Sequence, residues 1–190
     1  IQVLSPTRKL AAGTAALNRA LQEAVNPPAP GLGERRCGEF VFRQGDRVMQ
    51  VRNNYDIMWK ERDGLSSGMG VFNGDIGRIT EVDNRNEILT VDFEGRLVEY
   101  SPDMLTELEP AYAVTVHKAQ GSEYRAVVLA AVDGAPMLLT RGVLYTAITR
   151  ARELFIAVGD EQVLARMTAN NRQQRRYSGL RFRLAAGGQG

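Results

Sequence analysis

The feature that most restricts the fold is a block of short strand-like segments, at about residues 40–108, within a sequence otherwise typical of an α/β protein. Asn-, Asp- and Gly-rich turns separate these segments. Short strands at this spacing are typical of a small β-barrel. We expect a barrel here, with residues 56–70 as a mobile loop between two of its strands. The strand candidates are Val48–Val51, Ile76–Val82, Ile88–Phe93 and Leu97–Tyr100.

The sequence on both sides of this block alternates between strand and helix patterns. Residues 3–4 read as a strand, and a helix begins near Thr14, whose hydroxyl can cap the first turn. The apolar runs 127–132 and 154–158 indicate strands buried on both faces of a parallel sheet, with a helix at 144–152 between them. The first helix is expected to bury one apolar face: Leu17, Leu21, Ala24 and Val25.

These patterns predict an α/β domain whose sequence is interrupted by the barrel. Residues 1–39 form the first part of the α/β domain, and residues 40–108 form the inserted barrel. Residues 109–184 complete the α/β domain, and residues 185–190 are a flexible, low-complexity tail. The barrel is therefore joined to the α/β domain by two chain crossings.

Composition excludes several classes of protein. Hydrophobic residues make up 44% and charged residues 24%, as in globular proteins, and no apolar run is long enough to cross a membrane. A single cysteine, Cys37, and a single histidine, His117, exclude an internal disulfide and a histidine-rich metal site, so a reducing cytoplasm is expected. The start at Ile1 reads as a strand under way, as in a fragment of a longer chain. The net charge of +2 says little about nucleic acid, so any such function depends on where the charges lie.

A polar segment at residues 114–124 directly precedes one of the predicted buried strands. It combines a hydroxyl, an imidazole, an ammonium group, an amide, a glycine and a carboxylate. Backbone amides and small polar groups around a glycine can cradle an anion. An ordinary solvated turn explains this segment equally well when it is taken alone.

A second polar segment, at residues 144–153, combines helical spacing with arginines. Arg150 lies near its end, where an arginine could stabilise a phosphoryl group in transfer. The alternative is a surface arginine paired with Glu153. The apolar residues at helical spacing, expected to face a core, are Leu144, Ala147, Ile148 and Ala151.

Taken together, these segments resemble conserved helicase motifs. Residues 114–124 resemble motif V of superfamily 1 helicases and residues 145–152 resemble motif VI, in the same order and at a similar separation. The opening Leu4–Lys9, followed by a helix, resembles motif IV of RecD-like helicases. Three further stretches are similar to the same family: 45–55, 71–77 and 170–180.

The resemblance implies the C-terminal motor half of a RecD-like, superfamily 1 DNA helicase. It implies a second RecA-like domain interrupted by a barrel of the Src-homology-3 type. It also implies ATP-dependent 5′-to-3′ movement on single-stranded DNA, with RecB- and RecC-like subunits as possible partners and no membrane. The sequence contains no phosphate loop, so ATP and Mg²⁺ would be bound mainly by an N-terminal motor domain.

The resemblance also implies roles for individual residues. Arg150 would be the arginine finger, and Arg8 would be a second contact to the γ-phosphate. Gly121 and Glu123 would lie near the nucleotide. The residues implied near single-stranded DNA are Thr115, His117, Lys118 and Gln120. Two departures from the family pattern are Ala119, where serine is common, and an extra stretch at residues 58–70 of the barrel.

A different class of function is a non-catalytic nucleic-acid or protein-binding module of a DNA repair complex, with the barrel as its working part. A basic, aromatic patch could then form from Arg47, Arg52, Tyr55 and Arg78, although an ordinary solvated sheet face explains any single one of them better. A C-terminal basic cluster is expected either to attract DNA phosphates or to be a solvated face: Arg172, Arg175, Arg176, Arg181 and Arg183.

Overall fold

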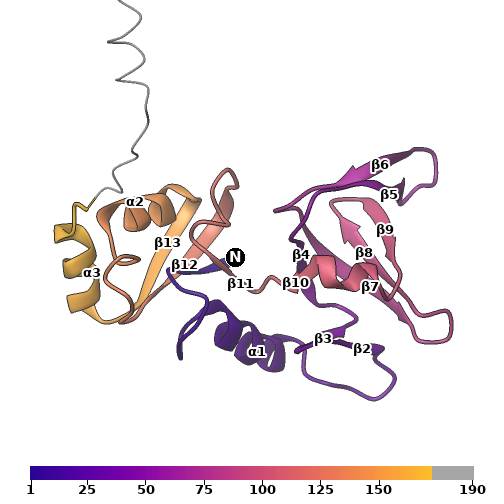
Figure 1. The fold of residues 1–190 in the computed structure, drawn as a ribbon, viewed down its shortest axis with the longest axis horizontal. Coiled ribbons are helices and arrows are strands. Elements are labelled where there is room, and N and C mark those ends of the chain that lie inside the picture. The colour runs from indigo at the N-terminus through magenta and orange to yellow at the C-terminus, as the bar shows by residue number, and fades with distance from the viewer. Residues whose placement is uncertain (173–190) are drawn as a thin grey trace, which may run out of the picture.

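The computed structural model describes residues 1–172, which form two main sheets with separate hydrophobic cores (Figure 1). The basic cluster and the tail predicted near the C-terminus lie outside the described residues, except for Arg172. Within residues 1–172, no helix combines the length and apolar character needed to cross a membrane. The candidate site lies where the two sheets approach each other.

The first sheet is parallel and has the strand order β11-β1-β12-β13. Leu4 pairs with Val114 on one side and with Leu129 on the other, so the N-terminal strand lies inside the sheet. Helices α2 (Arg141–Thr149) and α3 (Glu161–Ala169) supply Val143, Ala147, Val163 and Met167 to the core beneath it. The strands are β1 (Gln2–Ser5), β11 (Ala113–Thr115), β12 (Tyr124–Ala131) and β13 (Ala151–Gly159).

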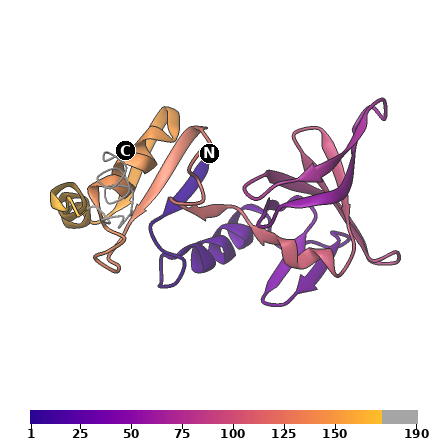
Figure 2. The same cartoon turned by 45° about the horizontal axis from the view of Figure 1, so that its top comes forward.

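The second sheet is antiparallel and has the order β10-β4-β7-β8-β9-β5-β6, and it curls around its own core (Figure 2). The turn at Glu94–Gly95 has positive φ at both residues, as a tight two-residue hairpin requires. A separate hairpin, β2 (Glu34–Cys37) and β3 (Phe40–Arg43), adds Phe42 to this core. The remaining elements are β4 (Arg47–Gln50), β5 (Asn54–Glu61), β6 (Ser67–Val71), β7 (Ile76–Asp83), β8 (Ile88–Phe93), β9 (Arg96–Tyr100), the 3-10 turn η1 (Met104–Glu107) and β10 (Leu108–Pro110).

The predicted fold class is confirmed: a parallel sheet with flanking helices accompanies a separate all-β unit. The expected mobile loop at residues 56–70 is wrong, because these residues form most of the β5–β6 hairpin. Ile57 points into the barrel core, whereas Met58 and Met69 face each other across the strands on the exposed side. The Gly- and Ser-rich composition marks only the tip of the hairpin.

Helix α1 (Thr14–Val25) differs from its predicted arrangement. Its N-cap is Gly13, without a side-chain cap, and Thr14 is instead a buried residue of the first turn. The predicted apolar face is not the buried one, because Val25 is 68% exposed while Gln22 is buried. Polar contacts replace apolar packing here: the Asn18 side chain bonds the backbone N–H and C=O of Ala113.

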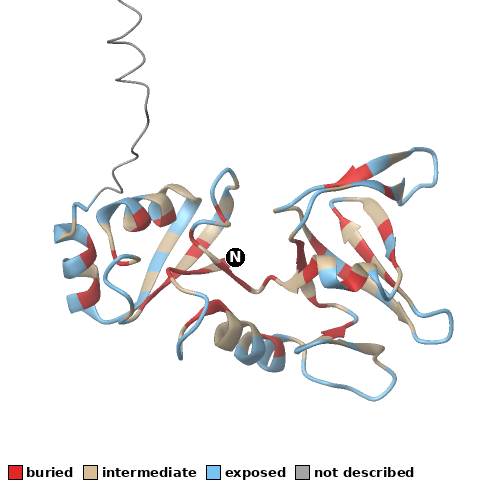
Figure 3. Ribbon diagram, viewed as in Figure 1, coloured by how far each residue is buried: buried red, intermediate tan, exposed pale blue. Residues whose placement is uncertain are grey.

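The predicted burial of the strand at residues 154–158 is also wrong. β13 is the edge strand of the parallel sheet, and Leu154, Ile156 and Val158 are 42–56% exposed (Figure 3). Phe155, which points the other way, packs on the core that α2 and α3 cover. An apolar run therefore identified the strand correctly but could not show that one of its faces lacks a covering layer in residues 1–172.

A buried carboxylate connects the two units. Asp46, in the turn between β3 and β4, is only 2% exposed. It accepts hydrogen bonds from Gln22 and Asn26 of the α1 region, from the hydroxyl of Tyr112 and from the backbone N–H of Arg43. Burial, followed by the nearby Asp46, raises the pKa of Tyr112, so its hydroxyl stays protonated and remains a donor. One side chain thus ties the barrel to α1 and to the chain returning to the parallel sheet.

Candidate functional site

The loop that carries Arg8 is held against the start of α1. The first helical amides donate to this loop, Thr14 N–H to the Thr7 carbonyl and Ala15 N–H to the Arg8 carbonyl. The approach is so close that a Cβ on Gly13 would lie 2.5 Å from the Arg8 carbonyl oxygen. Glycine is therefore required here, and the loop satisfies helix-terminal N–H groups that would otherwise have no partner.

The polar segment at residues 115–123 forms a turn that leads from β11 to β12. Thr115 Oγ1 accepts a hydrogen bond from the Lys118 N–H, and the Val116 N–H donates to the Ser5 carbonyl. Ala119 is fully buried in the core, so the residue that departs from the family pattern points away from solvent. Gly121 has φ of +89°, with open space where a side chain would be, so its backbone is accessible to a ligand.

The two segments singled out in the sequence are in direct contact. Tyr124 N–H donates to the Arg150 carbonyl at 2.8 Å, and Arg150 Nη1 donates to the Ser122 carbonyl at 2.9 Å. Arg150 lies at the C-cap of α2, so the predicted helix over residues 144–152 ends at Thr149, and Ala151 already belongs to β13. The turn of the first segment and the arginine of the second are therefore positioned by each other.

The guanidinium of Arg150 still has unused hydrogen-bonding capacity. Its Nε is buried and has no hydrogen-bond partner among the described residues. The predicted alternative, a surface pair with Glu153, is wrong, because Glu153 pairs with Arg125. Burial of a donor without a partner costs about 1–3 kcal/mol, which is tolerated more readily at a site that a ligand completes.

A second group of predicted residues gathers around Glu109 on β10. Its carboxylate accepts from Arg8 Nη2 at 2.8 Å and from Lys118 Nζ at 2.9 Å. Thr115 lines the same small cavity. The contacts therefore place Arg8 and Lys118 together, although the resemblance gives one to the nucleotide and the other to DNA.

The other predicted residues are placed as follows. His117, Gln120 and Gly121 are exposed on the turn. Glu123 is about half exposed and pairs with Arg152 at 2.8 Å. These residues lie on the same loop as Lys118, but the structure does not bring them into one pocket. Among the described residues, no cluster of three or more His, Cys, Asp or Glu side chains could hold a metal ion.

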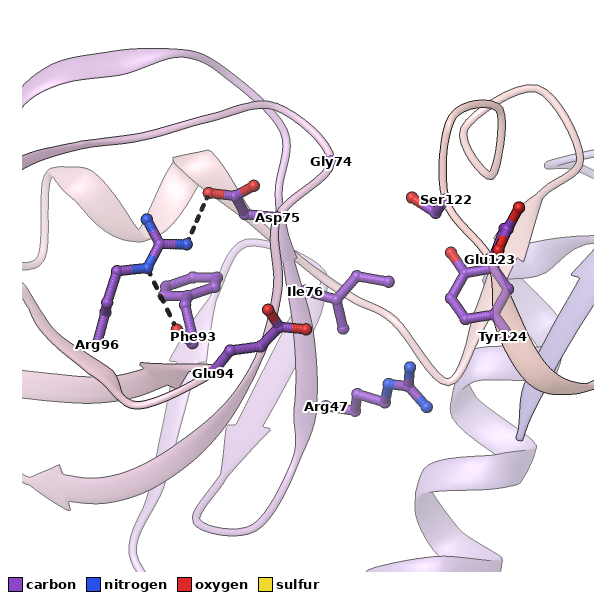
Figure 4. Close-up of a pocket in the computed structure, with 10 residues that line it drawn as sticks. All are labelled: Arg47, Gly74, Asp75, Ile76, Phe93, Glu94, Arg96, Ser122, Glu123 and Tyr124. Carbon is purple, nitrogen blue, oxygen red and sulfur yellow. Dashed lines mark hydrogen bonds and ion pairs between the residues drawn. The ribbon is translucent and has the colours of Figure 1, made fainter. Parts of the chain in front are cut away.

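A groove of about 290 Å³ separates this loop from the barrel (Figure 4). Ser122, Glu123 and Tyr124 line the side that belongs to the parallel-sheet unit, and the turn at Gly74–Asp75 lines the barrel side. Arg47 lies at its base, where burial lowers the pKa of the guanidinium, although a guanidinium remains charged at neutral pH. Burial raises the pKa of Tyr124, whose hydroxyl has no partner in the part of the chain that the structure describes.

The expected basic, aromatic patch of the barrel is divided in two. Arg47 pairs in register with Arg78 near the groove. Arg52 and Tyr55 do not line the groove, and the Tyr55 and Phe72 rings meet edge to face with centroids 5.6 Å apart. Both rings are exposed, Tyr55 by 66% and Phe72 by 42%. Phe72 was not singled out from sequence, because its partner comes from another strand.

Glu109 and Ser122 are also absent from the predicted site. Ser122 contributes a backbone carbonyl, which no side-chain pattern reveals. Glu109 belongs to an ordinary strand sequence, and only the return of β10 beside β4 brings it to Arg8.

Comparisons with known proteins agree with both units. The model of the "ATP-dependent RecD-like DNA helicase SH3 domain" matches residues 17–93, and the model of the "UvrD-like helicase C-terminal domain" matches residues 110–158. The ATP-dependent RecD2 DNA helicase of Deinococcus radiodurans is 36% identical over 92% of this chain and 22% of that protein. The RecBCD enzyme subunit RecD of Mycolicibacterium smegmatis is 34% identical over 98% of this chain and 30% of that protein.

Solved structures extend the agreement to the fold. Bacteroides Pif1 bound to single-stranded DNA matches 97% of this chain and 45% of that chain, with a TM-score of 0.55 and 16% identity. Pif1 helicase from Candida albicans matches 98% of this chain and 50% of that chain, with a TM-score of 0.50 and 16% identity. The chain thus spans less than a third of the two curated relatives. It belongs to the RecD-like helicases, as a C-terminal region that carries the SH3-type barrel and the UvrD-like C-terminal domain.

Proposed function

We propose that this chain is the part of an ATP-dependent DNA helicase that supplies an arginine finger and part of the single-stranded DNA track. The observation that carries the proposal is the direct bond between Arg150 and the turn at Ser122. A residue that contacts the nucleotide and a loop that contacts DNA must move together if hydrolysis is to drive movement. The named relatives, a RecD2 helicase and RecD subunits, support the same activity for the parent protein.

The residues present suit the γ-phosphate of ATP. Arg150 has a buried Nε without a partner among the described residues, and Gly121 presents open backbone on the adjoining turn. Arg8 is the second candidate, once it leaves Glu109. Bound ATP would supply the phosphoryl group whose hydrolysis releases free energy. Arg150 would place fixed positive charge beside the oxygens on which negative charge develops.

The DNA side would use the remaining residues of the turn. Thr115 ends β11, and His117, Lys118 and Gln120 follow it on the turn. Contacts to phosphate from such residues position a strand without reading its sequence. We propose 5′-to-3′ movement on the basis of the family, with RecB- and RecC-like subunits as candidate partners. The division of the chain into residues 1–39, 40–108 and 109–184 belongs to the same proposal.

The chain by itself is expected to lack ATPase activity. It has no phosphate-loop sequence, and residues 1–172 contain no acidic cluster suited to Mg²⁺, so the parent's other motor domain must provide both. The purified 190-residue chain should give turnover indistinguishable from buffer, with and without single-stranded DNA. Turnover that persists through repeated purification and depends on Arg150 would contradict the expectation.

One observation favours an additional DNA contact on the barrel. Exposed aromatic rings are costly to leave in water and are good surfaces for stacking unpaired bases. Tyr55 and Phe72 form such a pair, beside the exposed Arg52 and next to the Gly74–Asp75 wall of the groove. This pair also supports the alternative in which the barrel itself binds nucleic acid.

Removing these rings should weaken binding of single-stranded DNA. Tyr55→Ala or Phe72→Ala in the parent protein is expected to lower affinity for a fluorescent oligo-dT by roughly five- to 150-fold, because a stacked base contributes about 1–3 kcal/mol. Leu65→Ala is the matched control, since Leu65 is 86% exposed at the tip of the same hairpin. Equal affinities for all three variants and the unmodified protein would exclude this contact.

A further inference from the structure

We infer that Glu109 is a positioning residue that holds Arg8 and Lys118 in a resting arrangement until phosphate ligands replace it. The inference rests on the proposed function, which gives Arg8 to the nucleotide and Lys118 to the DNA backbone. It adds a residue to which neither the sequence motifs nor the family resemblance assigns a role. It also gives a physical link between the two ligands.

The contacts are specific to one carboxylate. Glu109 Oε1 accepts from Arg8 Nη2 at 2.8 Å, and Glu109 Oε2 accepts from Lys118 Nζ at 2.9 Å. The two cations come from loops about 110 residues apart in sequence, one after β1 and the other after β11. Each oxygen serves one cation, so the loss of either cation leaves the other pair intact.

The space around these groups is too small for a phosphate in the present arrangement. The cavity lined by Arg8, Glu109, Thr115 and Lys118 measures about 30 Å³. That is the volume of about one water molecule. A phosphate group is larger and carries the same charge sign as Glu109. It can therefore reach Lys118 from this side only when the carboxylate and the ammonium separate.

Both pairs are weak enough to be exchanged. The Arg8 side chain is 56% exposed and that of Lys118 is 35% exposed, so water already screens both interactions. A phosphate offers a stronger, charge-assisted acceptor to either cation. Glu109 itself is constrained by the backbone ladder of β10 with β4, where it lies opposite Met49. The cations move to the ligand, and the carboxylate stays with the barrel.

This arrangement links the two ligands through charge. When DNA takes Lys118, Glu109 keeps only Arg8 and holds it by the remaining pair. When the nucleotide takes Arg8, Lys118 in turn has the carboxylate to itself and is held more firmly, so each ligand opposes the release of the other's cation through Glu109. A displacement of the barrel would move Glu109 relative to both loops at once, because β10 is an integral strand of the barrel sheet.

The test uses the parent protein with Glu109→Gln, which keeps the shape of the side chain and removes its charge. Without nucleotide and at low salt, affinity for oligo-dT is expected to rise by about two- to tenfold. ATP turnover without DNA should rise as well, because Arg8 is no longer held by the carboxylate. In a Lys118→Ala background, Glu109→Gln should no longer raise DNA affinity, because the Lys118 ammonium that the substitution would release is absent.

Glu153→Gln is the matched control. It removes an exposed carboxylate of β13 that pairs with Arg125 of β12, and it should leave DNA affinity and ATP turnover unchanged. An equal gain in affinity from Glu109→Gln with and without Lys118 would indicate general charge repulsion and overturn the inference. So would unchanged DNA affinity and unchanged basal turnover in Glu109→Gln while Lys118→Ala weakens DNA binding. If Lys118→Ala and Arg8→Ala themselves change neither DNA binding nor hydrolysis, the proposed function of these residues fails as well.

Discussion

Arg150→Ala in the parent protein is expected to lower DNA-stimulated ATP turnover by about a thousandfold or more while ATP binding is largely retained. A guanidinium opposite the phosphate loop meets the γ-phosphate only when the two motor domains close. Its fixed charge then stabilises negative charge that grows in the transition state, so its loss affects the rate far more than ground-state binding. Steady-state turnover and nucleotide binding, measured separately, distinguish the two effects.

The structure refines the expectation for lysine at this position. Arg150 Nη1 is anchored on the Ser122 carbonyl and Nη2 donates to Thr149 Oγ1 at 3.4 Å, so Nε is the nitrogen without a partner among the described residues. Lysine has a single nitrogen and cannot hold the turn and contact phosphate in the same planar geometry. Arg150→Lys should therefore also be strongly impaired, with loss of turnover much closer to that of alanine than to the unmodified protein.

Arg152 provides the control two residues away. It pairs with Glu123 and is 65% exposed on β13, so Arg152→Ala should retain most of the turnover. Near-normal turnover in Arg150→Ala would refute the assignment, and Arg152 and Arg8 would become the next candidates for the finger. Thermal unfolding of each variant should accompany the kinetics, because Arg150 also joins α2 to the turn before β12.

Sequence patterns predicted which segments of this chain form strands better than they predicted what covers or pairs with those strands. Strands β1, β12 and β13 of the parallel sheet and β4, β7, β8 and β9 of the barrel were visible in apolar periodicity, because alternation and buried runs are properties of a single segment. Burial of β13 was not predictable in this way, since it depends on whether another layer covers Leu154 and Ile156. The β5–β6 hairpin was missed because its Gly- and Ser-rich tip hides the pairing of Met58 with Met69.

In the candidate site, too, local motifs predicted some residues, whereas residues brought in by long-range contacts were missed. Family motifs pointed to Arg150, Arg8 and Lys118, whose roles stay predictions. No local pattern could reveal Glu109, because its importance comes from the register of β10 against β4. Asp46 was equally hidden. An Asp in a Gly-Asp turn is common, and its burial arises from residues at 22, 26 and 112 that converge only in three dimensions.

Asp46→Ala is expected to destabilise the junction between the barrel and the α/β unit by about 3–5 kcal/mol. Removal of this buried carboxylate leaves donors from Gln22, Asn26 and Tyr112 without their acceptor. Each unsatisfied donor costs about 1–3 kcal/mol, and the chain cannot relax freely because Gly45 and Asp46 also bond the backbone of Ile79. Asp46→Asn should be only partly better, since its NH₂ group would face another donor.

Loss of the Asp46 carboxylate should also make the barrel and the α/β unit unfold less cooperatively with each other. The three side chains bound by Asp46 all lie outside the barrel sheet, whereas the chain's single tryptophan, Trp59, packs against the barrel core. Urea unfolding followed by Trp59 fluorescence and by far-UV circular dichroism should then give midpoints that diverge more in Asp46→Ala than in the unmodified chain. Asp56→Ala, which removes an exposed carboxylate from β5, is the control. Midpoints for Asp46→Ala that match this control would show that the barrel is held to the α/β unit by other contacts.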